Sequence, residues 1–135
     1  MNNPDTVRKM YADLLAGDFE ALTAVLDAGV EWAEPDLEYL PYAGLTVGRD
    51  NVVNNVYAKI PAVYEKVEFI PDRVIDGGDT VTVVGHAAMK GPHGDEVRFP
   101  FAHVIQLRDG LVTRFDHFVD THKIAQTLSA TAPTV

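Results

Sequence analysis

The spacing of apolar side chains divides the chain into a helical first part and a strand-rich second half. From Val7 to Leu15, apolar residues recur at intervals of three and four positions, which places them on one stripe of an amphipathic helix. Pro4 suits the first turn of this helix, because the N–H that proline lacks would have no intrahelical partner there. Gly17 is the expected end, because glycine readily adopts positive φ.

Two more helices and one short strand are expected before the main sheet begins. Asp18 should cap a second helix that closes at Gly29. Residues 30–34 are expected to form a short strand, in which successive side chains point to opposite faces. The segment 35–48 is predicted to be a loop, but its tyrosines and leucines are unusually apolar for one, so it should cover a pocket mouth or an interface. A third helix is expected over 50–60.

The second half alternates apolar and polar residues with a period of two, which is typical of β-strands. Gly-Gly and Asp-Gly pairs between the runs indicate hairpin turns. A short helix should follow the last strand. Helices followed by an antiparallel meander predict an α+β fold, as a single domain over 1–128 with a flexible tail over 129–135. The predicted strands are 67–75, 80–89, 97–107 and 111–119.

Composition excludes several classes of function. The net charge of −9 and pI of about 4.8 argue against nucleic acid and anionic membranes, which both need clustered Lys and Arg. The absence of cysteine excludes disulfides, thiolate nucleophiles and cysteine-based zinc sites. The N-terminus lacks the basic start and apolar core of a signal peptide, and no run reaches 18 apolar residues, so a cytoplasmic protein is expected.

Three histidines in successive predicted strands are the main candidates for chemistry. His103 and His117 each fall on the more apolar of the two alternating sets of their strand, the set expected to be covered. His86 is ambiguous, because both sets of its strand are apolar. The Asp109-Gly110 turn places His103 opposite residues 115–117, and neighbouring strands lie about 4.8 Å apart. The imidazoles could therefore share one face, as a proton-transfer site, a metal site or a polar patch of core.

Four segments follow one another along the chain: AGDFEAL (16–22), VEWAEP (30–35), LPYAGLTVGRDNV (40–52) and IQLRDGLVTRFDHFVD (105–120). In this order and at this spacing they resemble the nuclear transport factor 2-like superfamily, and most of all its SnoaL-like group. That group includes polyketide cyclases, and the superfamily includes ketosteroid isomerase and scytalone dehydratase. The resemblance implies a curved antiparallel sheet that forms a cone closed by N-terminal helices, a fold also called cystatin-like.

The resemblance also assigns roles to positions. Glu34, followed by proline, falls where ketosteroid isomerase has its general base, and His103 falls where that enzyme has its oxyanion donor. His86 and His117 match the catalytic carboxylates of limonene epoxide hydrolase, which implies that His86 points inward. Val84 replaces the arginine of that enzyme's motif, so epoxide hydrolysis is not expected. The sequence does not reproduce the complete set of catalytic residues of any of these enzymes.

Aromatic residues are expected to form the wall of the pocket. Trp32 lies two residues before Glu34, on the same face of the strand, and a carboxylate beside an indole is poorly solvated and therefore a better proton acceptor. The remaining residues expected to bind substrate are mostly aromatic and come from both halves of the chain. They are Tyr11, Tyr42, Tyr57, Phe99, Phe101, Phe115 and Val119.

The prediction is a cofactor-independent isomerase, dehydratase or cyclase acting on a hydrophobic cyclic carbonyl compound of polyketide, steroid or terpenoid type. Glu34, His103, His117 and His86 are its candidate catalytic residues. No metal is expected, because no short His-x-His or His-Glu-x-x-His motif is present. The alternatives are a non-catalytic small-molecule binding protein or a dimeric interaction domain, and a homodimer through the convex sheet face is expected in any case.

Overall fold

One six-stranded sheet organises the molecule, with the strand order β2-β1-β6-β5-β4-β3. The computed structural model describes residues 1–38, 40–92 and 95–128, and the predicted tail 129–135 lies outside them. Neighbouring strands are antiparallel except β1 and β6, which run parallel. The strands are β1 (Leu26–Glu34), β2 (Gly44–Val47), β3 (Lys66–Gly77), β4 (Thr80–Lys90), β5 (Val97–Arg108) and β6 (Leu111–Val119).

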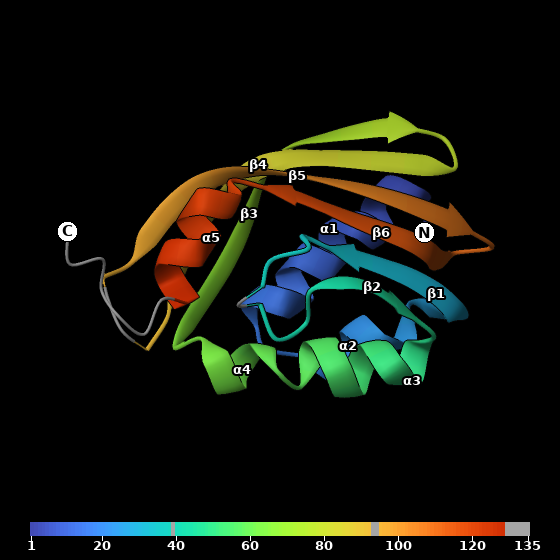
Figure 1. Ribbon diagram of the computed structural model, residues 1–135. Helices are drawn as coiled ribbons and strands as arrows, with labels where there is room; N and C mark the ends of the chain where they lie inside the picture. Colours follow the sequence, from blue (N-terminus) through green and yellow to red (C-terminus); the bar gives the residue numbers. More distant parts are fainter. Residues whose placement is uncertain (39, 93–94, 129–135) are drawn as a thin grey trace.

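The helices cover the concave face of the curved sheet (Figure 1), so the predicted α+β architecture is confirmed. In α1, the side chain of Asn2 caps the first turn, and Val7, Met10 and Tyr11 are buried, with the helix packed against β3 and β4. The helical elements are α1 (Asn3–Leu15), α2 (Phe19–Ala24), α3 (Arg49–Val52), the π-helical segment η1 (Val53–Tyr57), α4 (Ile60–Val63) and α5 (Thr121–Leu128).

Three predicted boundaries are wrong, each because pairing between distant segments overrides local sequence preference. The second helix ends at Ala24 rather than Gly29, since Leu26 is fully buried and paired with β6. The predicted loop 35–48 contains β2, which pairs with the end of β1. The expected helix over 50–60 is divided among α3, η1 and α4.

Alternation along β4 and β5 sets which side chains face the helices. On β4 the buried positions are the odd-numbered ones from Val81 to Met89, and on β5 those from Phe99 to Leu107. Gly85 makes room for this packing, because a Cβ there would lie 2.1 Å from the carbonyl oxygen of Ile70.

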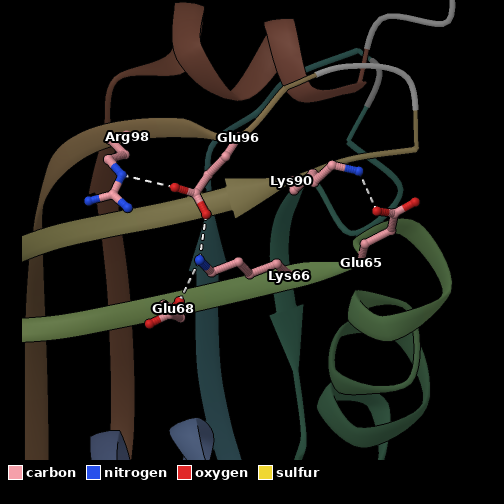
Figure 2. Close-up of polar contacts among 6 residues, drawn as sticks. All are labelled: Glu65, Lys66, Glu68, Lys90, Glu96 and Arg98. Atoms are coloured by element: carbon pink, nitrogen blue, oxygen red, sulfur yellow. Dashed lines mark hydrogen bonds and ion pairs between the residues drawn. The ribbon is translucent and has the colours of Figure 1, made fainter.

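Charged side chains link the ends of β3, β4 and β5 (Figure 2). Glu96 accepts from Lys66 and from Arg98, and Lys66 also lies 2.8 Å from Glu68. Hydrogen bonds from Lys66 and Arg98 lower the pKa of Glu96. These side chains are partly exposed to water, which weakens each ion pair, so the network contributes little to stability.

No helix in residues 1–38, 40–92 or 95–128 is long and apolar enough to cross a bilayer.

Candidate active site

A pocket of about 80 Å³ lies between the concave face of the sheet and the helices. Its wall is almost entirely apolar, and the polar exceptions are Glu34, His103, His117 and three tyrosines. Most of the predicted wall residues line it, but Phe99 and Phe101 are buried without reaching the cavity. The predicted residues that do line it are Tyr11, Trp32, Tyr42, Tyr57, Phe115 and Val119.

Glu34 and His117 form a hydrogen-bonded pair because β1 runs parallel beside β6. Ala33 pairs with Asp116, so the next residue of each strand points into the pocket at the same level. His117 Nδ1 lies 2.7 Å from Glu34 Oε1, and Trp32 Nε1 donates to Glu34 Oε2 at 2.7 Å. Both oxygens of the carboxylate are therefore used to hold neighbouring side chains, whose positions they fix.

The carboxylate determines which nitrogen of His117 is free. When the imidazole is neutral, Nδ1 carries the proton and donates it to Glu34, so Nε2 keeps its lone pair. The side chains of Glu34 and His117 are only 7% and 9% exposed. This arrangement, in which a carboxylate orients an imidazole whose other nitrogen is free, is the one that general bases use in enzymes.

In His103 the two ring nitrogens have the opposite roles to those in His117. Its Nδ1 lies 2.6 Å from the hydroxyl of Tyr11. Burial, with a smaller contribution from His117, lowers the pKa of His103 well below its ordinary value, and burial raises the pKa of Tyr11. Tyr11 is therefore protonated and has no other acceptor among the described residues, so its O–H donates to Nδ1 and Nε2 carries the hydrogen. His103 is thus a neutral N–H donor.

The two imidazoles are direct cross-strand neighbours, as the Asp109-Gly110 hairpin predicted. His103 pairs with His117, and their ring centroids lie 4.5 Å apart in an edge-to-face arrangement. Each Nε2 is buried and has no hydrogen-bond partner in the part of the chain that the structure describes. A lone-pair acceptor and an N–H donor therefore lie side by side at one end of an apolar pocket.

His86 does not join this pair, so the prediction that it points inward is wrong. Val83, not His86, pairs with the inward-facing His103, and His86 pairs with Pro100. Side chains alternate along a strand, so His86 faces the other side of the sheet. There its Nδ1 lies 3.0 Å from Asp72, and its side chain is 58% exposed.

Phe69 is a pocket residue that the sequence analysis missed. Its ring lies 5.3 Å from His103 and 5.3 Å from His117, measured between centroids, so it covers both imidazoles from β3. The alternation of Val67 and Phe69 with the charged Glu68 was the available signal. Among the described residues, no group of three His, Cys, Asp or Glu side chains could hold a metal ion.

Comparisons with known proteins agree with this fold. A family model for the SnoaL-like domain matches residues 7–115. A nuclear transport factor 2-like protein from Burkholderia thailandensis is 29% identical, with a TM-score of 0.84 over 96% of this chain and 99% of that one. One of unknown function from Burkholderia pseudomallei is 25% identical, with a TM-score of 0.88 over 96% and 100%.

A third similar structure contains a ligand. It is the structure of TerC co-crystallised with polyporic acid. TerC is 25% identical to this chain, with a TM-score of 0.83 over 92% of this chain and 95% of that one. Among curated proteins, none is significantly similar in sequence.

Proposed function

This chain belongs to the SnoaL-like domain family, and on that premise we propose that it is a cofactor-independent acid–base enzyme acting on a hydrophobic cyclic carbonyl compound. The observation that carries the proposal is the adjacent pair of imidazoles, one with a free lone pair and one with a free N–H. Removal of a proton next to a carbonyl needs these two groups, a base at the carbon and a donor at the oxygen.

In the proposed reaction, His117 Nε2 takes a proton from the carbon next to the carbonyl. The imidazolium that forms keeps its Nδ1–H on Glu34, whose negative charge stabilises it. His103 Nε2–H donates to the oxygen that becomes the enolate. Glu34, predicted as a candidate base, acts here as the positioning residue, because both of its oxygens are already occupied.

The proton on His117 can then return in three ways. Delivery to another carbon gives isomerisation. Delivery to a hydroxyl β to the carbonyl gives dehydration with loss of water. Attack of the enolate carbon on a second carbonyl gives ring closure, with the proton passing to the new alkoxide. All three outcomes begin with the same proton transfer, so this first step is the one to test.

The apolar wall favours a ring compound as the substrate. An engineered cavity of about 150 Å³ holds benzene, whereas this one has about 80 Å³. We therefore expect Phe69 to rotate away from the imidazoles when a ring enters. The co-crystallisation of a similar protein, TerC, with polyporic acid supports a small organic ligand here too.

The test follows the first step directly. Cyclic ketones and enones are incubated with the protein in D₂O, and NMR measures exchange of the hydrogens next to the carbonyl. We expect His117→Gln and Glu34→Gln to slow exchange by about 10²–10⁴-fold. His86→Gln, which replaces an exposed histidine on the other face, should leave the rate unchanged. Equal rates in all four proteins would refute the assigned roles.

A non-catalytic binding protein is the second candidate. The buried, water-poor position of the imidazoles favours it, because ligand hydrogen bonds alone would satisfy the two free nitrogens. Tight binding of a cyclic ketone without any exchange of its hydrogens would support this candidate over the enzyme.

A further inference from the structure

Tyr57 places a hydroxyl with no hydrogen-bond partner in the wall of the pocket. The residue lines the cavity and is 5% exposed. Its Oη is the one buried side-chain hydroxyl that lacks a partner within the described residues. By contrast, the hydroxyl of Tyr11 bonds to His103, and that of Tyr64 lies 3.0 Å from Thr127. A buried hydroxyl without a partner destabilises the free protein, so its retention calls for a use.

The ring of Tyr57 is held so that its hydroxyl cannot turn away to find a partner. It packs edge-to-face on Trp32, with centroids 5.3 Å apart, and against Phe19 at 5.6 Å. Tyr57 also ends the π-helical segment η1. One extra residue in a helical turn changes the direction of the side chains around it, and such segments occur often at functional sites.

Tyr57 and the imidazole pair lie on one connected wall. Trp32 contacts the ring of Tyr57 and donates to Glu34, and Glu34 in turn holds His117. Burial and the negative charge of Glu34 raise the pKa of Tyr57, so the hydroxyl stays protonated and can donate. Apart from Tyr42, the polar groups of the pocket therefore lie in two places, the imidazole pair with its partners Glu34 and Tyr11, and the Tyr57 hydroxyl, with the indole of Trp32 in contact with both.

We propose that Tyr57 donates a hydrogen bond to a second oxygen of the ligand, distinct from the oxygen that His103 contacts. The substrate class is then a cyclic ketone with a further hydroxyl or carbonyl group, rather than a ketone with one oxygen. The inference rests on the proposed function only for the place of the first oxygen, and the second contact needs no catalysis.

The experiment uses a matched set of ligands. α-Tetralone has one oxygen, and 5-, 6- and 7-hydroxy-1-tetralone each add a hydroxyl at a different place on the far ring. Dissociation constants are measured by calorimetry and by quenching of Trp32, the only tryptophan of the chain, which lies in the pocket wall. We expect at least one hydroxytetralone to bind about tenfold more tightly than α-tetralone, which corresponds to one ordinary hydrogen bond.

Variants assign that gain to one atom. Tyr57→Phe should abolish the tenfold preference and leave the affinity for α-tetralone unchanged. Tyr64→Phe, the control, removes a buried tyrosine hydroxyl outside the pocket lining and should keep the preference. In the absence of ligand, Tyr57→Phe should be as stable as the wild-type protein or more so, whereas Tyr64→Phe should be less stable, because only Tyr64 loses a hydrogen bond.

Two results would overturn the proposal: no gain from the hydroxyl in the wild-type protein, or the same gain in Tyr57→Phe. Its failure can be told apart from that of the proposed function. A hydroxyl preference that depends on Tyr57, in a protein that never exchanges the ketone's hydrogens, would leave the second oxygen site standing and refute the enzyme. Hydrogen exchange that depends on His117, in a protein that binds α-tetralone and the hydroxytetralones equally tightly, would support the enzyme and refute the second oxygen site.

Discussion

The buried, neutral His103 should make stability fall as the solution is acidified. In the folded protein, burial keeps its pKa well below the ordinary value of 6.5, but in the unfolded chain the imidazole is solvated and titrates normally. Below pH 6.5 the unfolded state therefore binds a proton that the folded state does not. The stabilisation is fully present above pH 6.5 and declines as the pH falls toward the folded-state pKa.

The size of this effect follows from the same two states. With an unfolded pKa of 6.5 and an imidazole that stays neutral in the fold, acidification from pH 7.5 to 5.5 should reduce the free energy of unfolding by about 1 kcal/mol through His103 alone. In urea, where the free energy of unfolding of such a domain falls by about 1–3 kcal/mol per molar, this loss corresponds to a midpoint shift of roughly 0.5 M.

Urea unfolding of three proteins at a series of pH values isolates this contribution. His103→Gln keeps an acceptor for the Tyr11 hydroxyl but cannot titrate, so between pH 7.5 and 5.5 it should lose about 1 kcal/mol less stability than the wild-type protein does. His122→Gln, which removes an exposed histidine, should follow the wild-type curve. Parallel curves for the wild-type protein and His103→Gln would refute the conclusion that the imidazole is held neutral in the fold.

Two other features give simpler tests. A Cβ at Gly91 would lie 1.9 Å from the carbonyl oxygen of Thr127 in α5. Urea unfolding should therefore show that Gly91→Ala lowers the free energy of unfolding by about 1–3 kcal/mol. The control Gly29→Ala has room for its methyl group and should lower it by less than about 1 kcal/mol. We also propose that the convex face of the sheet forms a homodimer. Phe118→Asp on that face should shift sedimentation toward the monomer, and Leu15→Asp, which replaces an equally exposed residue (58%), should not; identical sedimentation of both variants would count against this interface.

The sequence predicted correctly those features that depend on alternation within one strand or on a hairpin turn between two strands. His103 and His117 each fell on one apolar set, and the Asp109-Gly110 turn placed His103 opposite residues 115–117. The pairing of His103 with His117 itself depends on a register shift between Gln106 and Leu107, which the turn alone does not predict. The apolar pattern left His86 ambiguous and the resemblance placed it wrongly, because the residues on both sides of β4 are apolar and only the register with β5 decides the face. A difference of one residue in that register reverses the side of the sheet.

Contacts between distant segments were the part that sequence could not supply. Nothing local indicated that β1 would run parallel to β6, although this pairing brings Glu34 to His117. The bond between Tyr11 and His103 likewise depends on how α1 crosses the sheet. Helix packing and strand order are set by the whole core rather than by residues near either partner, so the roles of base and positioning residue became distinguishable only in three dimensions.

The long sequence separation of two of the pocket hydrogen bonds affects how the protein is made. The partners are 83 residues apart in one and 92 in the other, and β6 is the last of the described strands to leave the ribosome. Until then the unpaired edges of β1 and β5 are open to other chains. A nascent chain stalled before β6 would therefore lack the imidazole pair and be prone to aggregate, so chaperone binding during translation should be strongest in that interval.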